Sequence, residues 1–234
     1  MIPLKTESAW QGTADCKACG IRDLVLFADL NVHDFGLIHA PIDELDVPAG
    51  AHLFTEGATV RGIFTLRIGM IKLVRSTQDG RPRIVRVLRA GDVVGLEALA
   101  QTQYNSDAVA LTPASVCRIP LEVVQNLSIS SPRLHTQLMK KWQHNLKEAD
   151  DWLADMNFGS AHRRVGNLVL KMRSTENGEI SMLFSREDMG AMLDLKLETV
   201  SREISRLVRD GTIAQIDKQG RIYRVLQPDR LLQD

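Results

Sequence analysis

Apolar and polar positions divide the chain into a strand-rich first half and a helical second half. Between about residues 42 and 120, short apolar runs alternate with glycines. The clearest runs are 51–54, 62–67, 70–75, 84–88 and 115–119, with Gly50, Gly57, Gly69, Gly80, Gly91 and Gly95 between or beside them. Strands this short, with turns this regular, predict an all-β sandwich or barrel.

A long helix is predicted from Pro132 to about Met156, since proline is tolerated in a first helical turn. Its most regular stripe advances by four and three residues and consists of Leu138, Trp142, Asn145, Ala149, Trp152 and Met156. This heptad spacing predicts that the helix pairs with a second copy of itself. The alternative is packing against the β domain of the same chain, through Leu134, Leu146 and Leu153.

Two short helical stripes follow, separated by a tight turn at 194–196. Their apolar members are Met189, Leu193, Leu195, Val200, Ile204, Leu207 and Val208. Two short amphipathic helices joined by such a turn predict a helix-turn-helix. Gly211 can end the second helix, and the alternating segments 212–216 and 221–225 flank a turn signal at 217–220. The sequence therefore predicts a winged helix-turn-helix with Lys218 and Arg221 near the wing tip, where both could meet phosphate.

The polar face of the second predicted helix carries hydrogen-bonding groups suited to DNA bases. Glu198, Ser201, Arg202, Ser205 and Arg209 recur at intervals of three and four, so they share one face. Glutamate can accept from cytosine N4, arginine can bond guanine O6 and N7, and serine can approach thymine. The alternative is an ordinary solvated helix with mixed charges. We favour base reading, because stripe, turn and polar face coincide in a known docking geometry.

Composition restricts the function classes but does not by itself suggest a nucleic acid partner. The 234 residues are 44% hydrophobic and 25% charged, and the formal net charge is zero, so any DNA-binding surface must be local. The chain has no apolar run long enough to span a membrane and no secretory signal pattern, which predicts a cytoplasmic protein without a membrane partner. It also lacks a phosphate-binding glycine loop, a nucleophile elbow and paired metal motifs, so we expect no enzyme.

The segment Glu198-Thr199-Val200-Ser201-Arg202 resembles the E-x-x-S-R recognition signature of the CRP/FNR family of bacterial transcription regulators. The resemblance is to the FNR branch and implies a half-site like TTGAT. Thr199 belongs to this signature and is included among the expected DNA-contacting residues.

One position departs from the family pattern at the start of the recognition helix. Lys196 stands where the family usually places a capping Ser or Thr. We expect Lys196 to contact a phosphate instead.

The resemblance extends to the first half, where 48–50, 69–72 and 90–92 look like the family's cyclic-nucleotide-binding β-roll. It implies an α+β protein with an N-terminal β-roll, a long dimerisation helix and a C-terminal winged helix-turn-helix. The expected parts are a cysteine-containing segment at 1–22, the β-roll sensor at 23–131, the dimerisation helix at 132–157 and the DNA-binding domain at 158–234.

Two departures argue against cyclic AMP as a ligand. The motif 91–95 keeps its glycines, but Leu96 stands where the cyclic AMP receptor branch has a ribose-binding glutamate. Ser106 and Asp107 replace the Arg-Ser pair that would hold the phosphate, and an aspartate there would repel it.

Three cysteines raise the question of a redox or metal site. By resemblance to the FNR branch, Cys16, Cys19 and Cys117 match three of the four ligands of a [4Fe–4S] cluster. The missing ligand would fall at Val25 or Phe27, neither of which binds iron, whereas such clusters ordinarily take four thiolates. We therefore name no resident cofactor.

Two alternatives remain open for these cysteines. A cluster could use a substitute ligand such as Asp15, Asp23 or Asp29, or Cys16 and Cys19 could form a dithiol switch. The simplest interpretation of Cys117 is a buried apolar residue. The sequence thus predicts a homodimeric regulator that binds double-stranded DNA and, if it is an activator, RNA polymerase.

Overall fold

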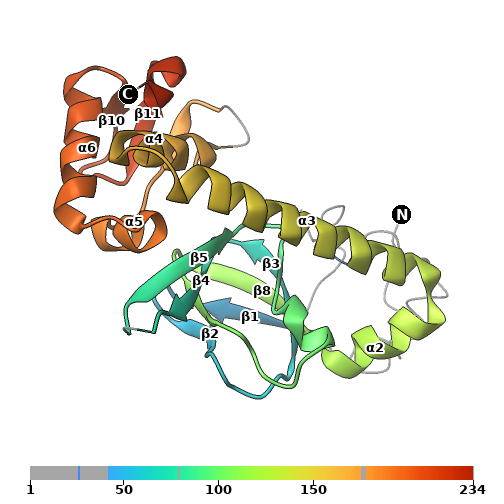
Figure 1. The fold of residues 1–234 in the computed structure, drawn as a ribbon. Coiled ribbons are helices and arrows are strands. Elements are labelled where there is room, and N and C mark those ends of the chain that lie inside the picture. The colour runs from blue at the N-terminus through green and yellow to red at the C-terminus, as the bar shows by residue number, and fades with distance from the viewer. Residues whose placement is uncertain (1–25, 27–41, 79, 175–177, 234) are drawn as a thin grey trace. The chain divides into compact units, whose positions relative to one another are not determined.

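The computed structural model describes residue 26 and residues 42–78, 80–174 and 178–233. The chain forms two compact units. The first contains 1–75 and 86–147, and the second contains 76–85 and 148–234. Figure 1 shows the strands of the first and the helices of the second.

The β-roll of the first unit consists, within the described residues, of two four-stranded sheets, with orders β1-β8-β3-β6 and β2-β7-β4-β5. Its strands are β1 (Asp43–Val47), β2 (His52–Phe54), β3 (Gly62–Ile68), β4 (Ile71–Ser76), β5 (Pro82–Leu88), β6 (Val93–Val94), β7 (Asp107–Ala110) and β8 (Ala114–Pro120). The strand runs predicted from the sequence are confirmed.

One hydrophobic core fills the space between the sheets. Ile63, Leu66, Ile71 and Val116 are inaccessible to solvent and belong to this core. The short helix η2 (Leu96–Leu99) and helix α2 (Leu121–Ser130) add further apolar side chains to this core. Neither helix was identified from the sequence: η2 is a single turn between strands, and α2 lies directly between β8 and the next helix.

Helix α3 (Pro132–Asn157) carries two different apolar faces. On one face, Leu134 and Leu138 are buried in the β-roll core. The same side of the helix reaches the turn before β6, where Lys141 Nζ donates to the Gly91 carbonyl oxygen (2.8 Å). Burial lowers the pKa of the Lys141 ammonium, and the charge of Asp92 opposes this shift.

The other face of α3 leaves large apolar side chains exposed. Met139, Trp142, Leu146 and Leu153 are 50%, 40%, 60% and 56% exposed, and Ala149 lies between the last two. These five residues, which we call the exposed seam, are separated by three or four positions, as in a coiled coil.

The exposed seam corrects the predicted dimer stripe. Leu138, Trp152 and Met156 were expected in the interface, but the structure buries all three within the chain. The alternative that Leu146 and Leu153 pack against the β domain is wrong as well, because both are largely exposed. Trp142 and Ala149 belong to both stripes, whereas Asn145 is half-buried beside them.

The second unit contains the predicted winged helix-turn-helix. Its elements are α4 (Ala161–Lys171), β9 (Ile180–Met182), α5 (Arg186–Leu193), α6 (Leu197–Arg209), β10 (Ile213–Gln215), β11 (Ile222–Val225) and the short helix η3 (Pro228–Leu232). The wing sheet has the order β10-β11-β9, and β9 is a strand that sequence reasoning missed. Among the described residues, no helix is long and apolar enough to cross a membrane.

Candidate nucleic-acid interface

The turn between α5 and α6 has the backbone geometry of a helix-turn-helix. Helix α5 starts at a serine cap, since Ser185 Oγ accepts from the Asp188 backbone N–H (3.0 Å). It ends at Asp194, whose φ of 53° is left-handed. A Cβ added to Gly190 would lie 2.6 Å from the Leu195 carbonyl oxygen, so only glycine permits this close approach.

Helix α6 begins without a side-chain cap. Lys196 occupies the N-cap position, makes no capping hydrogen bond and is exposed. This agrees with the expectation that lysine is a poor cap there. An exposed lysine at a helix N-terminus adds its charge to the positive end of the helix dipole, which favours an approaching phosphate.

The two faces of α6 separate as the sequence predicts. Val200, Ile204 and Leu207 are buried against the rest of the unit. On the opposite side, the exposed residues are Glu198, Arg202, Ser205 and Arg209, while Thr199 and Ser201 are half-buried. The six predicted recognition-helix side chains therefore lie on the outer side and flanks of α6.

A buried polar cluster behind this face was missed from the sequence. His162 on α4 and Glu203 on α6 are each 8% exposed, and His162 Nδ1 lies 3.3 Å from Glu203 Oε2. Arg202 and Arg206 approach the same carboxylate, each with a nitrogen 3.8 Å from an oxygen. Glu203 thus links α6 to α4 through His162. Its carboxylate also lies beside the guanidinium of Arg202, which is expected to bond guanine.

The wing is held by hydrogen bonds at its tip. Asp217 accepts from the backbone N–H groups of Ile222 (2.8 Å) and Arg221 (3.0 Å). The pKa of the Asp217 carboxyl lies below its usual value, chiefly because of the Ile222 hydrogen bond. This tight turn presents Lys218 to solvent, so the predicted phosphate contact has an accessible ammonium.

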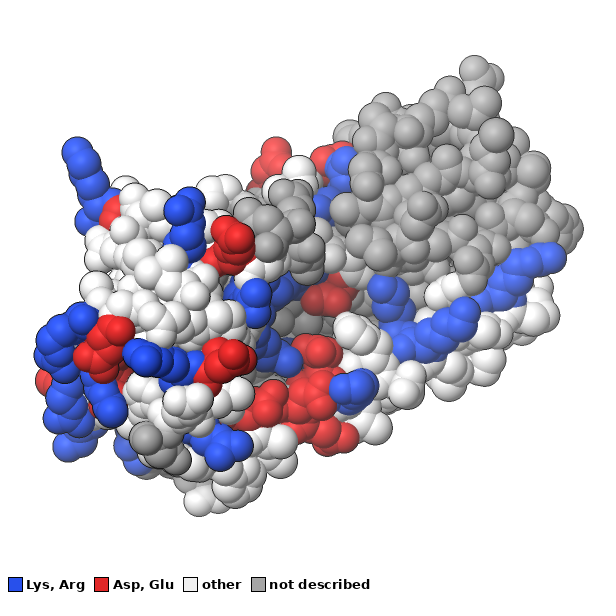
Figure 2. Space-filling view, turned by 90° about the horizontal axis from the view of Figure 1, so that it is seen from above, with Lys and Arg blue, Asp and Glu red and all other residues white. Residues whose placement is uncertain are grey.

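Charges on the outer surface are local and mixed. At the left of Figure 2, the side on which α6 lies in Figure 1, Lys and Arg side chains are interspersed with Asp and Glu. The side chains of Arg202 and Arg209 are 74% and 73% exposed. A chain with zero net charge therefore still offers basic groups on this helix.

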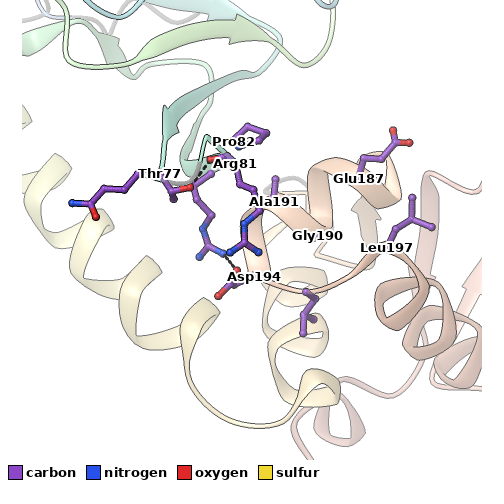
Figure 3. Close-up of a pocket in the computed structure, with 11 residues that line it drawn as sticks. Thr77, Arg81, Pro82, Glu187, Gly190, Ala191, Asp194 and Leu197 are labelled. Carbon is purple, nitrogen blue, oxygen red and sulfur yellow. Dashed lines mark hydrogen bonds and ion pairs between the residues drawn. The ribbon is translucent and has the colours of Figure 1, made fainter.

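The second unit also contains a cleft of about 760 Å³ beside the helix-turn-helix turn. Arg83 is one of its lining residues, and its Nη1 is 2.5 Å from Asp194 Oδ1. Figure 3 shows Asp194 at this cleft. The Arg83 guanidinium also donates to Asn157 Oδ1 (3.1 Å). These contacts fix the side chain of the residue in the left-handed turn.

The positions discussed for cyclic AMP are occupied by an apolar side chain and a carboxylate. Leu96 is 5% exposed and belongs to the core. Asp107 Oδ1 accepts from the Glu56 backbone N–H (2.7 Å), and its other oxygen lies 4.0 Å from His52 Nε2. The carboxylate is thus held in place as a negative group.

The structure describes one of the three cysteines that were considered as metal ligands. Cys16 and Cys19 lie outside the described residues. Cys117 is a half-buried residue on β8, opposite Glu44 and Thr65 in the sheet register. Within the part of the chain that the structure describes, no three His, Cys, Asp or Glu side chains gather as a metal site.

These observations define a DNA-binding regulator with a β-roll and a winged helix-turn-helix. Comparison with family models agrees: residues 44–130 match the cyclic nucleotide-binding domain and residues 163–233 the Crp-like helix-turn-helix domain. The chain belongs to the CRP/FNR family of transcription regulators.

The relatives that the chain resembles include two fumarate and nitrate reduction regulatory proteins, and a solved structure shares its fold. The chain is 28% identical to the fumarate and nitrate reduction regulatory protein of Escherichia coli K12 over 225 residues, covering 93% of this chain and 89% of that protein. The Salmonella typhi protein of that name is 29% identical over 206 residues, with 85% and 82% coverage. The structure of FixK2 from Bradyrhizobium japonicum shares the fold, with a TM-score of 0.73, 23% identity, and 82% and 96% coverage.

Proposed function

We propose that this regulator binds, as a homodimer, a palindrome built from two FNR-like TTGAT half-sites, and that it does so without cyclic AMP. The observation that carries the proposal is the outer face of α6, where Glu198, Ser201 and Arg202 are grouped while the opposite face is buried. In the helix-turn-helix docking mode, the N-terminal part of this helix meets base edges in the major groove.

The side chains on this face suit the single G·C pair of the half-site. Arg202 is assigned to guanine O6 and N7, and Glu198 to the N4 amino group of the paired cytosine. Ser201 would lie near a thymine. Lys196 and Lys218 stand at either side as phosphate contacts, which position the protein without carrying sequence information. Thr199, Ser205 and Arg209 extend the contact surface along α6.

Homodimerisation supports the palindrome, because a two-fold protein matches two-fold DNA. The exposed seam favours homodimerisation, because four large apolar side chains on one stripe of α3 would remain in water in a single chain. Ala149, in the middle of this stripe, is small and uncharged, so two copies can approach closely without repulsion.

Two features support independence from cyclic AMP. The ribose position is an apolar core residue, Leu96, and the phosphate position is the carboxylate of Asp107. Binding a phosphate beside that carboxylate would set like charges together. The cytoplasmic location, and contact with RNA polymerase if the protein activates transcription, stay predictions from the sequence and family.

A fluorescence anisotropy titration tests the proposal. Two labelled duplexes of equal length are compared, one with two TTGAT half-sites centred about one helical turn apart, the other with both half-sites scrambled. We expect preference for the palindrome at fixed salt without added nucleotide, and a stoichiometry of two chains per duplex. Equal affinity for both duplexes would contradict sequence-specific binding, and a need for cyclic AMP would contradict the second part.

A further inference from the structure

A second cleft, separate from the DNA-binding surface, lies in the β-roll. It has a volume of about 520 Å³, within the range typical of small-molecule sites. We call it the β2–β8 cleft, and its lining includes His52, Phe54, Arg61, Phe64, Tyr104 and Arg118. Leu96, Ser106 and Asp107 are not among its described lining residues, although His52 in the lining lies 4.0 Å from Asp107.

The apolar wall of the cleft is aromatic and rigid. The rings of Phe54 and Tyr104 are stacked, with centroids 3.7 Å apart and planes 8° from parallel. The Tyr104 hydroxyl donates to the Gly62 carbonyl oxygen (2.7 Å), which fixes the ring. Phe64 stands next to Phe54 at a centroid distance of 6.0 Å. Such a wall suits a flat apolar or aromatic molecule.

The polar part of the lining is cationic. Arg61 and Arg118 contribute two guanidinium groups, and none of the described lining residues is Asp or Glu. Arg118 pairs with Asp43 through Nη2, and its buried Nε has no hydrogen-bond partner among the described residues. Arg61 is exposed and forms no ion pair with a carboxylate of the described residues. The Arg118 side chain is 41% exposed, so its guanidinium and that of Arg61 are both accessible to an anion.

We propose that the β2–β8 cleft binds a small aromatic acid, with its ring against Phe54 and Tyr104 and its anionic group on Arg61 and Arg118. Planar guanidinium groups match carboxylate and phosphate geometry, and they also stack on aromatic faces. The inference concerns a ligand site in the first unit and stands independently of which DNA sequence the second unit reads.

Isothermal titration of the full chain tests this with three probes: 1-naphthoate, 1-naphthyl phosphate and the uncharged 1-naphthamide. We expect one site per chain for at least one acid, and binding of the amide at least about tenfold weaker, because a charge-assisted hydrogen bond is lost. The two acids distinguish a carboxylate from a phosphate ligand.

The decisive variant is Arg61→Gln, with Arg75→Gln as the matched control. Both arginines are exposed on the first unit, but Arg75 does not line the cleft. Arg61→Gln should weaken acid binding by about tenfold or more, while Arg75→Gln leaves it unchanged. The proposal is overturned if neither acid binds at about 1 mM, if the amide binds as tightly as the acids, or if the two variants behave alike.

Discussion

Replacement of Leu146 by alanine should weaken the dimer while leaving the fold of each chain intact. Leu146 is 60% exposed in the single chain, and burying a whole leucine side chain contributes about 1.5–3 kcal/mol. Burial of the exposed part, counted in both copies, therefore amounts to about 2–4 kcal/mol. This corresponds to about a 30- to 700-fold increase in the dimer dissociation constant.

Sedimentation equilibrium over a concentration series measures this constant directly, and thermal unfolding at low concentration reports on the single chain. Ile129→Ala is the matched control, because Ile129 is 85% exposed on α2, outside the exposed seam. It should leave both measurements near those of the unsubstituted protein.

Leu138→Ala separates the exposed seam from the stripe first predicted. Leu138 is 4% exposed and belongs to the β-roll core, so its truncation should destabilise the single chain by about 2–5 kcal/mol. If Leu146→Ala and Ile129→Ala give the same dissociation constant, the interface does not involve this seam and the argument fails.

Four further outcomes are expected. Arg202→Ala should cost about 1–3 kcal/mol on the palindrome and relax the preference for guanine, whereas Lys218→Ala should weaken palindromic and scrambled duplexes alike, both measured by anisotropy. Cyclic AMP should give no binding at micromolar concentrations in calorimetry, and a micromolar affinity would overturn the pocket argument. The double change Cys16→Ser and Cys19→Ser should leave the iron-free protein a dimer in air with DNA affinity within a few-fold; a monomer that dimerises only after iron and sulfide loading would restore the cluster hypothesis. Gly190→Ala should destabilise the second unit by about 1–3 kcal/mol in thermal unfolding, since its Cβ would meet a backbone carbonyl at 2.6 Å.

The recognition helix could be predicted in detail because its information is local. Buried positions Val200, Ile204 and Leu207 repeat with helical period, and the turn before them has a strong signal. The exposed polar face follows from the same period. By contrast, His162 and Glu203 are 41 residues apart, and neither belongs to a motif. Their pairing depends on how α4 packs on α6, which periodicity does not specify.

The dimer stripe was misassigned for a different physical reason. Helix α3 has apolar side chains on two neighbouring faces, and both satisfy a spacing of three and four. Trp142 and Ala149 belong to both stripes, so the heptad pattern alone does not say which face the β-roll covers. In the structure, Leu134 and Leu138 are buried in the β-roll core, so the β-roll covers that face of α3. Leu146 lies on the other face and is exposed.

The hydrogen bond from Lys141 to the Gly91 carbonyl joins a β-roll turn to the same helical turn that carries Trp142. Two binding equilibria that share a structural element are linked reciprocally. Suppose that breaking the contact between the Gly91 turn and α3 weakens the dimer by some factor. Dimerisation must then make breaking of that contact less favourable by the same factor. Dimerisation alone therefore stabilises the Gly91 turn of the β-roll, in the way that a bound effector would. Dilution, which dissociates the dimer, should increase amide hydrogen exchange at this turn before any small molecule is added.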